Sequence, residues 1–449
     1  MTMSRFLLKN AVIVTGATSF NGSLGVDGER IAGIWEGYPS FTGVKEIDLG
    51  GRILMAGAID THVHFREPGL TRKADIGSES AAAVLGGVTS FIDMPNTSPP
   101  TVNLSGLDGK IRRAGSVSRA NYGFHIGATN ENAGQIKRYI QLGLGHQFAG
   151  VKVFMGSSTG NILVDRESTL EDLFTIKGKP ILTHCEDETI IKANLERAKA
   201  TYGEMIPFSM HPLVRSREAC VESTRKALEL ALRHGTRLHI LHVSTADEVE
   251  MIREAKLHNP EITAETSVNY LWFSDDDYRL MGGRLKCNPS IKTAADRDAL
   301  VRGLMDGVID TIGSDHAPHL SEEKARPYLS CPSGLPTIQN SLPAAMTIAR
   351  KRGIPMTRLA SAISEKAATI FGIKDRGFLK RGFFADLVVL DQDKEYPVGP
   401  PASRCGWSPY EGEIFKGAVD MVWVNGSLVV REGRLTGKRL WSRPLLYQA

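Results

Sequence analysis

The middle of the chain alternates short apolar runs with longer stretches in which apolar residues recur at helical spacing. This alternation is typical of a parallel sheet whose strands are joined by helices. Eight apolar runs predict strands over residues 54–63, 88–95, 121–128, 149–155, 180–185, 237–243, 262–268 and 309–314. Helices are expected between them, for example over 74–86, 215–234, 245–257 and 294–306. Eight such units predict an α/β fold, a (β/α)8 TIM-type barrel, over residues 55–380.

An open, doubly wound sheet is the structural alternative to a barrel. A dinucleotide-binding version of that sheet has little support, because no GxGxxG motif follows the first apolar run.

The two ends of the chain differ from the middle, since both show short strands separated by turns. In the first 54 residues, Asp27-Gly28 between two apolar stretches is a strong hairpin signal. The C-terminal part repeats this pattern over 385–391 and 419–426. We therefore predict a small β-sandwich domain formed by both termini, residues 1–54 together with 381–449.

Composition excludes several classes of protein. Of the 449 residues, 42% are hydrophobic and 23% charged, and the formal net charge is only +4. No basic patch with interleaved aromatic residues indicates nucleic-acid binding. No stretch approaches the roughly 20 apolar residues of a membrane span, and Lys9 and Asn10 interrupt the N-terminal apolar run. Five cysteines without CxxC spacing fit a reducing compartment. We expect a soluble, cytoplasmic protein that binds neither nucleic acid nor membrane.

The first apolar run ends in Asp60-Thr61-His62-Val63-His64. His62 and His64 point to the same side of a strand, and two imidazoles at this spacing can bind one divalent metal. Alone, the pair is equally compatible with core histidines. Further residues of metal-binding type accompany later strands, namely Lys152, His184, His242 and Asp315. Because barrel strands bring their C-terminal ends to one face, the set predicts a metal site there.

Lys152 lies inside an apolar strand, where an unpaired ammonium group is costly. Taken alone, it would be interpreted as a lysine whose charged end reaches the strand end. Beside four histidines and an aspartate, we favour a carbamate formed with carbon dioxide, an anion that can bridge two metals.

The remaining histidines receive other interpretations. His239 precedes His242 by three residues, so we expect it on the opposite side of the strand, in a core or helix-facing position. His125 is inside the third strand and has no predicted partner. We predict surface positions for His146, His211, His234 and His258. Alternation turns Cys185 away from His184, so it is not a predicted ligand.

Several motifs together resemble the dihydroorotases of the amidohydrolase superfamily. They are residues 60–69 (DTHVHFREPG), 94–97 (MPNT), 152–155 (KVFM), 242–244 (HVS) and 314–319 (SDHAPH), and the likeness extends to residues 382–388 near the C-terminus. The resemblance implies two zinc ions per chain. His62, His64 and Asp315 would hold the first ion, His184 and His242 the second, and carboxylated Lys152 would bridge them.

Arg66 distinguishes between substrates, because dihydroorotate carries a carboxylate that neutral dihydropyrimidines lack. A guanidinium two residues after His64 can bind that carboxylate through two hydrogen bonds, and a loop salt bridge with Glu67 is the alternative. The resemblance adds further substrate contacts from His64, Asn96, Asn288, His319, Ser333 and Gly334. Two segments depart from the family pattern, 288–292 (NPSIK in place of Asn-Pro-Pro-Leu-Arg) and 268–272 (VNYLW in place of a His-His pair).

The implied reaction is the reversible cyclisation of N-carbamoyl-L-aspartate to L-dihydroorotate, a step of pyrimidine synthesis. Asp315 would act as general base and then as general acid, and the polar segment 319–331 is interpreted as a lid. A dihydropyrimidinase (hydantoinase) or an allantoinase remains the alternative among enzymes, and a non-catalytic amidohydrolase-like scaffold the alternative outside them. The resemblance also implies a homodimer and an association with aspartate transcarbamoylase.

Overall fold

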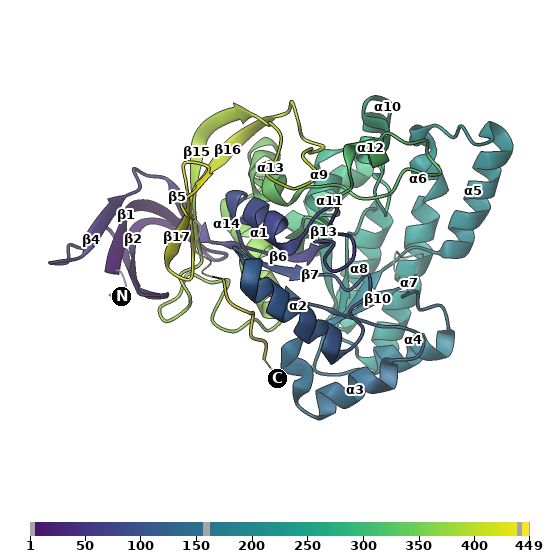
Figure 1. Ribbon diagram of the computed structural model, residues 1–449, viewed down its shortest axis with the longest axis horizontal. Helices are drawn as coiled ribbons and strands as arrows, with labels where there is room; N and C mark the ends of the chain where they lie inside the picture. Colours follow the sequence, from purple (N-terminus) through teal and green to yellow (C-terminus); the bar gives the residue numbers. More distant parts are fainter. Residues whose placement is uncertain (1–4, 156–161, 438–441, 449) are drawn as a thin grey trace.

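The computed structural model describes residues 5–155, 162–437 and 442–448. The predicted terminal domain includes residues 1–4, 438–441 and 449, which lie outside the described residues. Figure 1 shows a strand-rich part on the left, formed by purple N-terminal strands and yellow C-terminal strands, beside a larger part built of strands and helices.

The larger part is a closed barrel of parallel strands. In chain order the strands are β6 (Ala58–Val63), β7 (Val88–Asp93), β8 (Asn121–Phe124) continued by β9 (Ile126–Gly127), β10 (Val151–Phe154), β11 (Ile181–His184), β12 (Leu238–Ile240), β13 (Thr263–Ser267) and β14 (Thr311–Gly313). Strands β6 to β8 pair in order, and so do β9 to β14. Val63 forms a parallel bridge with His316, just after β14, and this bridge closes the ring. The predicted (β/α)8 barrel is confirmed.

Helices join and surround the strands. They are α1 (Ile76–Leu85), α2 (Leu104–Val117), α3 (Ala133–Gln141), α4 (Glu167–Phe174), α5 (Glu188–Tyr202), α6 (His211–Val214), α7 (Arg217–His234), α8 (Ala246–His258), α9 (Val268–Trp272), α10 (Tyr278–Met281), α11 (Ala294–Met305), α12 (Ser321–Lys324), α13 (Ile338–Arg352), α14 (Met356–Ala360) and α15 (Lys366–Ile370). The four helices named from the sequence begin and end within two residues of their predicted bounds. Helix α8 begins where it does because Thr245 and Glu248 form a capping box.

The first predicted strand, 54–63, is divided between the two parts of the molecule. β5 (Ile53–Ala56) pairs with β15 (Leu387–Pro397) in the terminal sheet, whereas β6 begins the barrel at Ala58. Gly57 separates them, and a Cβ atom at Gly57 would lie 2.2 Å from Cγ2 of Thr89 in β7. The chain therefore passes from one sheet to the other at a point where only glycine fits.

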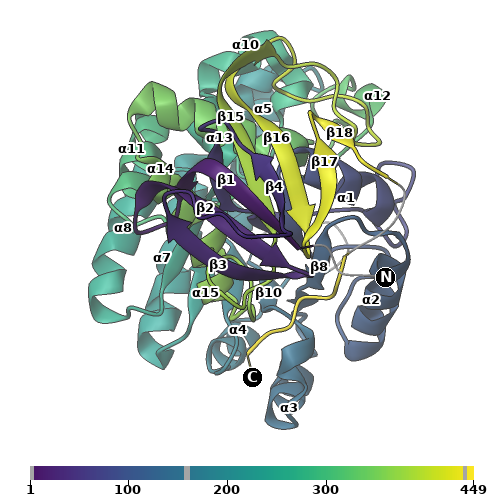
Figure 2. The ribbon, with the colours of Figure 1, turned by 90° about the vertical axis from the view of Figure 1, so that its left-hand side faces the viewer.

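Strands from both chain ends form the second sheet, which Figure 2 views from its outer side. Its further members are β1 (Arg5–Val14), β2 (Ser19–Asp27), β3 (Arg30–Glu36), β4 (Lys45–Asp48), β16 (Ile414–Val424), β17 (Ser427–Arg431) and β18 (Arg434–Leu435). The strand order is β18-β17-β16-β15-β5-β1-β2-β3, and β4 pairs with β1. β2 and β3 form the predicted hairpin, with Gly28 at a φ of 63°.

The terminal sheet encloses its own apolar core. Buried side chains from the N-terminal strands, such as Phe6 and Leu24, pack with Leu387 and Trp423 from the C-terminal strands. The rings of Phe6 and Trp423 stack with their centroids 6.0 Å apart. This packing confirms a β-sandwich built from both termini, while the predicted boundaries at residues 54 and 381 stay a prediction.

Two of the histidine predictions were wrong. His211, predicted at the surface, is 1% exposed, and its ring contacts the Tyr328 hydroxyl and the Cys287 carbonyl oxygen, each at 2.8 Å. His239, predicted on the side of the strand opposite to His242 and in a core or helix-facing position, is buried, but its direction was predicted wrongly. It is paired across β11 and β12 with Leu182, which in turn is paired with the inward-facing Lys152. Residues directly opposite one another in a sheet share a face, so His239 points inward.

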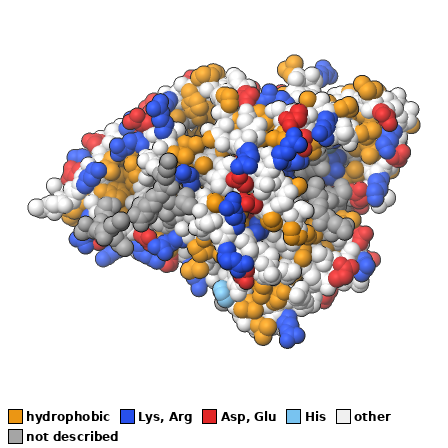
Figure 3. Space-filling view, viewed as in Figure 1, with side chains coloured by type: hydrophobic (Ala, Val, Ile, Leu, Met, Phe, Trp, Pro, Cys, Tyr) orange, Lys and Arg blue, Asp and Glu red, His pale blue; other side chains and the backbone are white. Residues whose placement is uncertain are grey.

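The surface shows no concentration of one charge on the face drawn in Figure 3, where basic and acidic side chains are interspersed. Among the described residues, the search for a helix long and apolar enough to span a membrane found none.

Candidate active site

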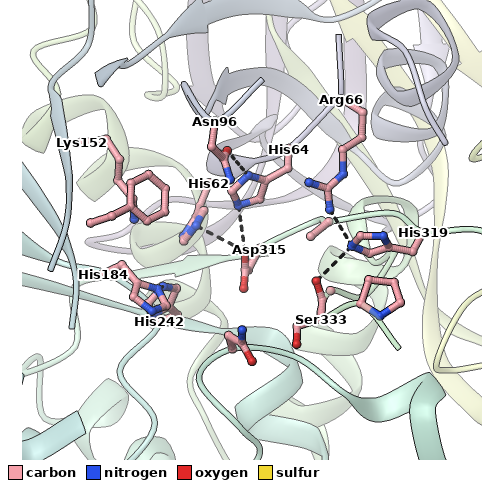
Figure 4. A pocket seen from close by; sticks show the side chains of 15 residues that line it. His62, His64, Arg66, Asn96, Lys152, His184, His242, Asp315, His319 and Ser333 are labelled. Carbon is pink, nitrogen blue, oxygen red and sulfur yellow. Dashed lines mark hydrogen bonds and ion pairs between the residues drawn. The ribbon is translucent and has the colours of Figure 1, made fainter. Parts of the chain in front are cut away.

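A cavity of about 210 Å³ lies at the C-terminal ends of the barrel strands, and every predicted site residue lines it (Figure 4). The structure thus brings together residues that are up to 272 positions apart in the sequence, from His62 to Gly334. The predicted residues in its wall are His62, His64, Arg66, Asn96, Lys152, His184, His242, Asn288, Asp315, His319, Ser333 and Gly334. Phe154, Ala317 and Pro332 complete the lining.

His62, His64 and Asp315 form a cluster that can hold a metal ion, because their ligand atoms all lie within 4.8 Å of one another. Nε2 of His62 and Nε2 of His64 are each 3.3 Å from Oδ1 of Asp315. Burial lowers the pKa of His64 to about 4, so its imidazole is neutral near pH 7.

The outer nitrogen of each imidazole is fixed by an oxygen. Nδ1 of His62 lies 2.7 Å from Oε1 of Glu265, and Nδ1 of His64 lies 2.8 Å from Oδ1 of Asn96. A carboxylate or amide oxygen only accepts, so each Nδ1 carries the proton. Each Nε2 therefore directs its lone pair toward Asp315. The two lone pairs and the carboxylate oxygen of Asp315 meet where a metal ion could bind.

His184 and His242 form a second group of possible metal ligands next to the first, since the ring centroids of His62 and His242 are 5.2 Å apart. Nδ1 of His184 lies 2.9 Å from Nε2 of His242, and burial lowers the pKa of both imidazoles. Nε2 of His184 donates to Oε2 of Glu186 over 2.9 Å. This bond leaves the lone pair of Nδ1 directed into the cavity.

Three of the residues that line the cavity lie just after barrel strands and have left-handed backbone conformations, which set the directions of their side chains. The φ angles of Arg66, His242 and Asp315 are 65°, 40° and 47°, values that residues other than glycine rarely adopt. Each residue follows a barrel strand by two or three positions. The regular alternation of side chains ends there, which allows consecutive functional residues to enter one cavity.

Lys152 is 1% exposed, belongs to β10 and is one of the residues that line the cavity. Its ammonium nitrogen lies 4.5 Å from the centre of the Phe154 ring. Burial lowers the pKa of Lys152 to about 7, so a large share of the amine is unprotonated at neutral pH. An unprotonated amine is the form that reacts with carbon dioxide.

Arg66 is 5% exposed, and its side chain contacts neutral groups rather than a carboxylate. Its Nε donates to the Pro318 carbonyl oxygen over 3.1 Å, and Nη2 lies 3.1 Å from Nε2 of His319. Glu67, the alternative partner, instead binds Arg113 over 2.7 Å. Within the described ranges, no carboxylate lies within ion-pair distance of Arg66. A buried guanidinium without a counter-charge, at the wall of a cavity, is suited to bind an anion.

The opposite wall is formed by Ser333, Gly334 and Asn288. Two buried lysines anchor this wall through backbone carbonyl oxygens. Nζ of Lys324 donates to the carbonyls of Lys286, Pro332 and Gly334 over 2.8 to 3.0 Å, and Nζ of Lys286 donates to those of Tyr328 and Cys331 over 2.7 Å. The segment interpreted as a lid is thus tied to the barrel, and its role in closure stays a prediction. The buried Oδ1 of Asn288 has no hydrogen-bond partner among the described residues.

Sequence reasoning assigned no role to three charged residues beside the ligands. Glu265 fixes His62, Glu186 fixes His184, and Arg215 binds Glu186 through contacts of 3.0 and 3.1 Å from its Nε. The sequence could have indicated a role for Glu265, because it is a charged residue inside an apolar strand, as Lys152 is. Glu186 comes two residues after His184, directly at a strand end.

A parallel barrel with histidines, a lysine and an aspartate at its strand ends defines a class of hydrolases. The chain belongs to the amidohydrolase family, whose pattern matches residues 53–429. The protein is thus a hydrolase of this family, and its barrel carries a cluster of residues that could bind a metal.

Named relatives are similar over most of their length. A dihydroorotase of Methanosarcina acetivorans is 34% identical over 406 residues, which cover 86% of this chain and 85% of the relative. An allantoinase of Deinococcus radiodurans is 30% identical and covers 96% of each chain. Among solved structures, an L-hydantoinase (dihydropyrimidinase) of Arthrobacter aurescens has a TM-score of 0.91 at 28% identity, covering 98% of this chain and 99% of its own.

Proposed function

We propose that the protein is a dihydroorotase, which interconverts N-carbamoyl-L-aspartate and L-dihydroorotate in pyrimidine synthesis. The observation that carries the proposal is Arg66, a buried guanidinium at the cavity wall without a carboxylate partner in the described residues. Leaving a buried charge unpaired is costly, and a substrate carboxylate would supply the missing counter-charge. Dihydroorotate carries that carboxylate, whereas dihydrouracil, hydantoin and allantoin do not.

The relatives support a cyclic amide as substrate, because those named above act on such rings by their printed names. The dihydroorotases of two Methanosarcina species share 34% identity with this chain, and the two allantoinases 30%. The hydantoinase with a TM-score of 0.91 favours a neutral ring as the alternative substrate. Arg66 favours an anionic ring over a neutral one.

The residues fit two metal ions. Three imidazole lone pairs and the carboxylate of Asp315 are directed at the cavity, since the outer nitrogens of His62, His64 and His184 all donate elsewhere, and His242 lies beside them. A cation between the imidazole nitrogens and the Asp315 carboxylate, which face one another at 3.3 Å, would relieve the repulsion between these acceptors. His62, His64 and Asp315 would hold one zinc ion and His184 and His242 the other, with Lys152 bridging as a carbamate. When bound, such ions supply a water of lowered pKa and polarise the scissile carbonyl.

The side chains supply binding and proton transfer. Arg66 binds the substrate carboxylate together with His319 and Asn96, while Asn288 and the backbone of Ser333 and Gly334 contact the ring. In the hydrolytic direction Asp315 accepts a proton from the attacking water. It then returns this proton to the departing ring nitrogen, and the cyclisation reverses these transfers.

Turnover of four substrates by the zinc-loaded protein tests the proposal. We expect activity with L-dihydroorotate, little or none with dihydrouracil, hydantoin and allantoin, and loss of activity in chelator. Arg66→Met should lower kcat/KM for dihydroorotate by about a hundredfold, which corresponds to roughly 2.7 kcal/mol of a charge-assisted pair. Arg113→Met is the matched control, because Arg113 pairs with Glu67 outside the cavity wall.

Other outcomes point elsewhere. Preference for a neutral ring would favour a hydantoinase or allantoinase, and no turnover together with no bound zinc would favour a scaffold. The homodimer and the association with aspartate transcarbamoylase remain part of the proposal, to be tested by sedimentation and by co-purification with that enzyme.

A further inference from the structure

His319 has a hydrogen-bonding environment that determines where its proton lies. On one side of the ring, Nδ1 lies 2.9 Å from the ammonium nitrogen of Lys73. On the other side, Nε2 lies 3.0 Å from the carbonyl oxygen of Ser333 and 3.1 Å from Nη2 of Arg66. Because an ammonium group only donates, Nδ1 must accept. The proton therefore sits on Nε2, where the Ser333 oxygen can accept it.

An ion pair with Glu323 fixes the position of the Lys73 ammonium group beside His319. Its Nζ also lies 3.1 Å from Oε1 of Glu323, and the two side chains are only 20% and 16% exposed. The other oxygen of Glu323, Oε2, accepts from the backbone N–H of Leu320 over 3.0 Å and lies 3.7 Å from Nδ1 of His319. Lys73 thus stands between Glu323 and His319. Without Lys73, the carboxylate is the nearest group able to accept a proton from Nδ1.

We propose that Lys73 is a positioning residue for the anionic substrate, because it locks His319 in the Nε2–H tautomer and so keeps His319 from accepting a hydrogen bond from Arg66. Two donors that lie 3.1 Å apart cannot bond to each other, and Nε2–H donates to Ser333, so an anion is the partner that satisfies Nη2 of Arg66. The reversed tautomer would direct a lone pair at Nη2 of Arg66 and compete with the anion for its hydrogen bond. This inference rests on the proposed function, since the anion is taken to be the carboxylate of dihydroorotate.

Sequence neighbours explain why Lys73 reaches the site. Two backbone hydrogen bonds, from Leu70 to Arg66 and from Lys73 to Leu70, fold residues 66–73 into consecutive turns. Gly69 allows this fold, because its φ is 88° and a Cβ atom would lie 1.9 Å from the Ser98 oxygen. The loop returns Lys73 to the side of His319 opposite Arg66.

The test removes the ammonium of Lys73 and follows the proton of His319 directly. Histidine labelled with 13C and 15N reports the tautomer by NMR, and the His319 signal is assigned by its loss in His319→Asn. We expect the Nε2–H tautomer in the wild-type protein and the Nδ1–H form in Lys73→Met. For dihydroorotate, KM should rise by about tenfold in Lys73→Met while kcat changes less than about twofold. Lys73→Arg, which keeps a donor, should restore both readouts.

Two further variants sharpen the result. Arg72→Met removes the same charge one residue earlier, from a side chain that is 80% exposed and pairs with Glu322, and it should change neither readout. Lys73→Met with Glu323→Ala removes the competing acceptor as well, so the Nε2–H tautomer should return in part.

The outcomes separate this inference from the proposed function. An unchanged tautomer in Lys73→Met overturns the inference, whatever the substrate is. A changed tautomer with an unchanged KM for dihydroorotate also overturns the proposed role in binding. If the wild-type protein does not turn over dihydroorotate, the proposed function fails, and the NMR result still decides whether Lys73 sets the tautomer.

Discussion

Glu186→Gln should weaken both the fold and the binding of metal by His184. Glu186 is fully buried, accepts from Nε2 of His184 over 2.9 Å and is paired with Arg215, which is 7% exposed. Removing one partner of a buried ion pair costs about 3–5 kcal/mol, because the other charge stays buried and unpaired. We expect a value near the lower limit, about 3 kcal/mol, since the glutamine oxygen still accepts one hydrogen bond.

Loss of the carboxylate also weakens the hold on His184. Groups that orient a metal-binding histidine typically contribute 10- to 100-fold in metal affinity, or about 1.4–2.7 kcal/mol. Urea unfolding of the metal-free protein measures the first effect, and competition with a zinc chelator measures the second. Glu196→Gln on helix α5 is the control, because Glu196 is 69% exposed and pairs only with Lys199 in the contacts described.

The difference in the free energy of unfolding between the wild-type protein and Glu186→Gln should decrease as the pH falls. Burial raises the pKa of Glu186, but Arg215 and His184 outweigh it and hold this pKa well below its usual range. The unfolded chain therefore binds the proton at higher pH than the folded protein, and stability falls with acidification. The difference between wild type and Glu186→Gln should be complete at pH 7 and shrink below the ordinary glutamate pKa of about 4.3. Equal urea midpoints at pH 7, with equal zinc affinity, would refute this reasoning.

Three further changes test other parts of the structure. Because burial lowers the pKa of Lys152 to about 7, zinc reconstitution supported by bicarbonate should accelerate from pH 6 to pH 8; a rate independent of pH would contradict a carbamate. Gly334→Ala should lower kcat/KM at least about tenfold, since its Cβ would lie 2.4 Å from the Ala317 oxygen, whereas Gly134→Ala, with open space, should be neutral. Trp423→Ala should cost about 3–5 kcal/mol in urea unfolding and leave kcat unchanged, because Trp423 packs in the terminal sheet.

The positions of the barrel strands were predictable because parallel strands are buried on both faces. Each strand therefore appears as an apolar run, whichever face its residues occupy, and β7, β11 and β13 fall inside the runs 88–95, 180–185 and 262–268. The division of the run 54–63 was not predictable, because the apolar residues Ile53–Ala56 continue into Ala58 and Ile59 with only Gly57 between them. It depends on a close approach of Gly57 to Thr89 that no local pattern reveals.

Side-chain direction was predictable only where the strands are regular. His62 and His64 point to the same side, as the alternation of side chains along a strand predicts. The alternation does not extend to His242, because β12 ends at Ile240 and His242 has a φ of 40°. His239 and His242 consequently both point inward, although alternation separates them. Pairs such as His62 with Glu265, which are 203 positions apart, depend on barrel closure and leave no trace in the sequence spacing.

The terminal sheet also takes part in forming the site, through the segment that connects β15 and β16. From this segment, the indole N–H of Trp407 donates to the carbonyl oxygen of His319 over 2.7 Å. The hydroxyl of Ser403 donates to Glu79 over 2.6 Å, and Glu79 in turn contacts Nε2 of His316 at 2.7 Å. The C-terminal part of the chain therefore holds both ends of the segment 316–319, His316 through Glu79 and His319 through Trp407. His316 directly follows Asp315 in the sequence. The two ends of the chain thus form one sheet at a distance from the cavity, and a connection of that sheet extends back to brace the wall where an anion would bind.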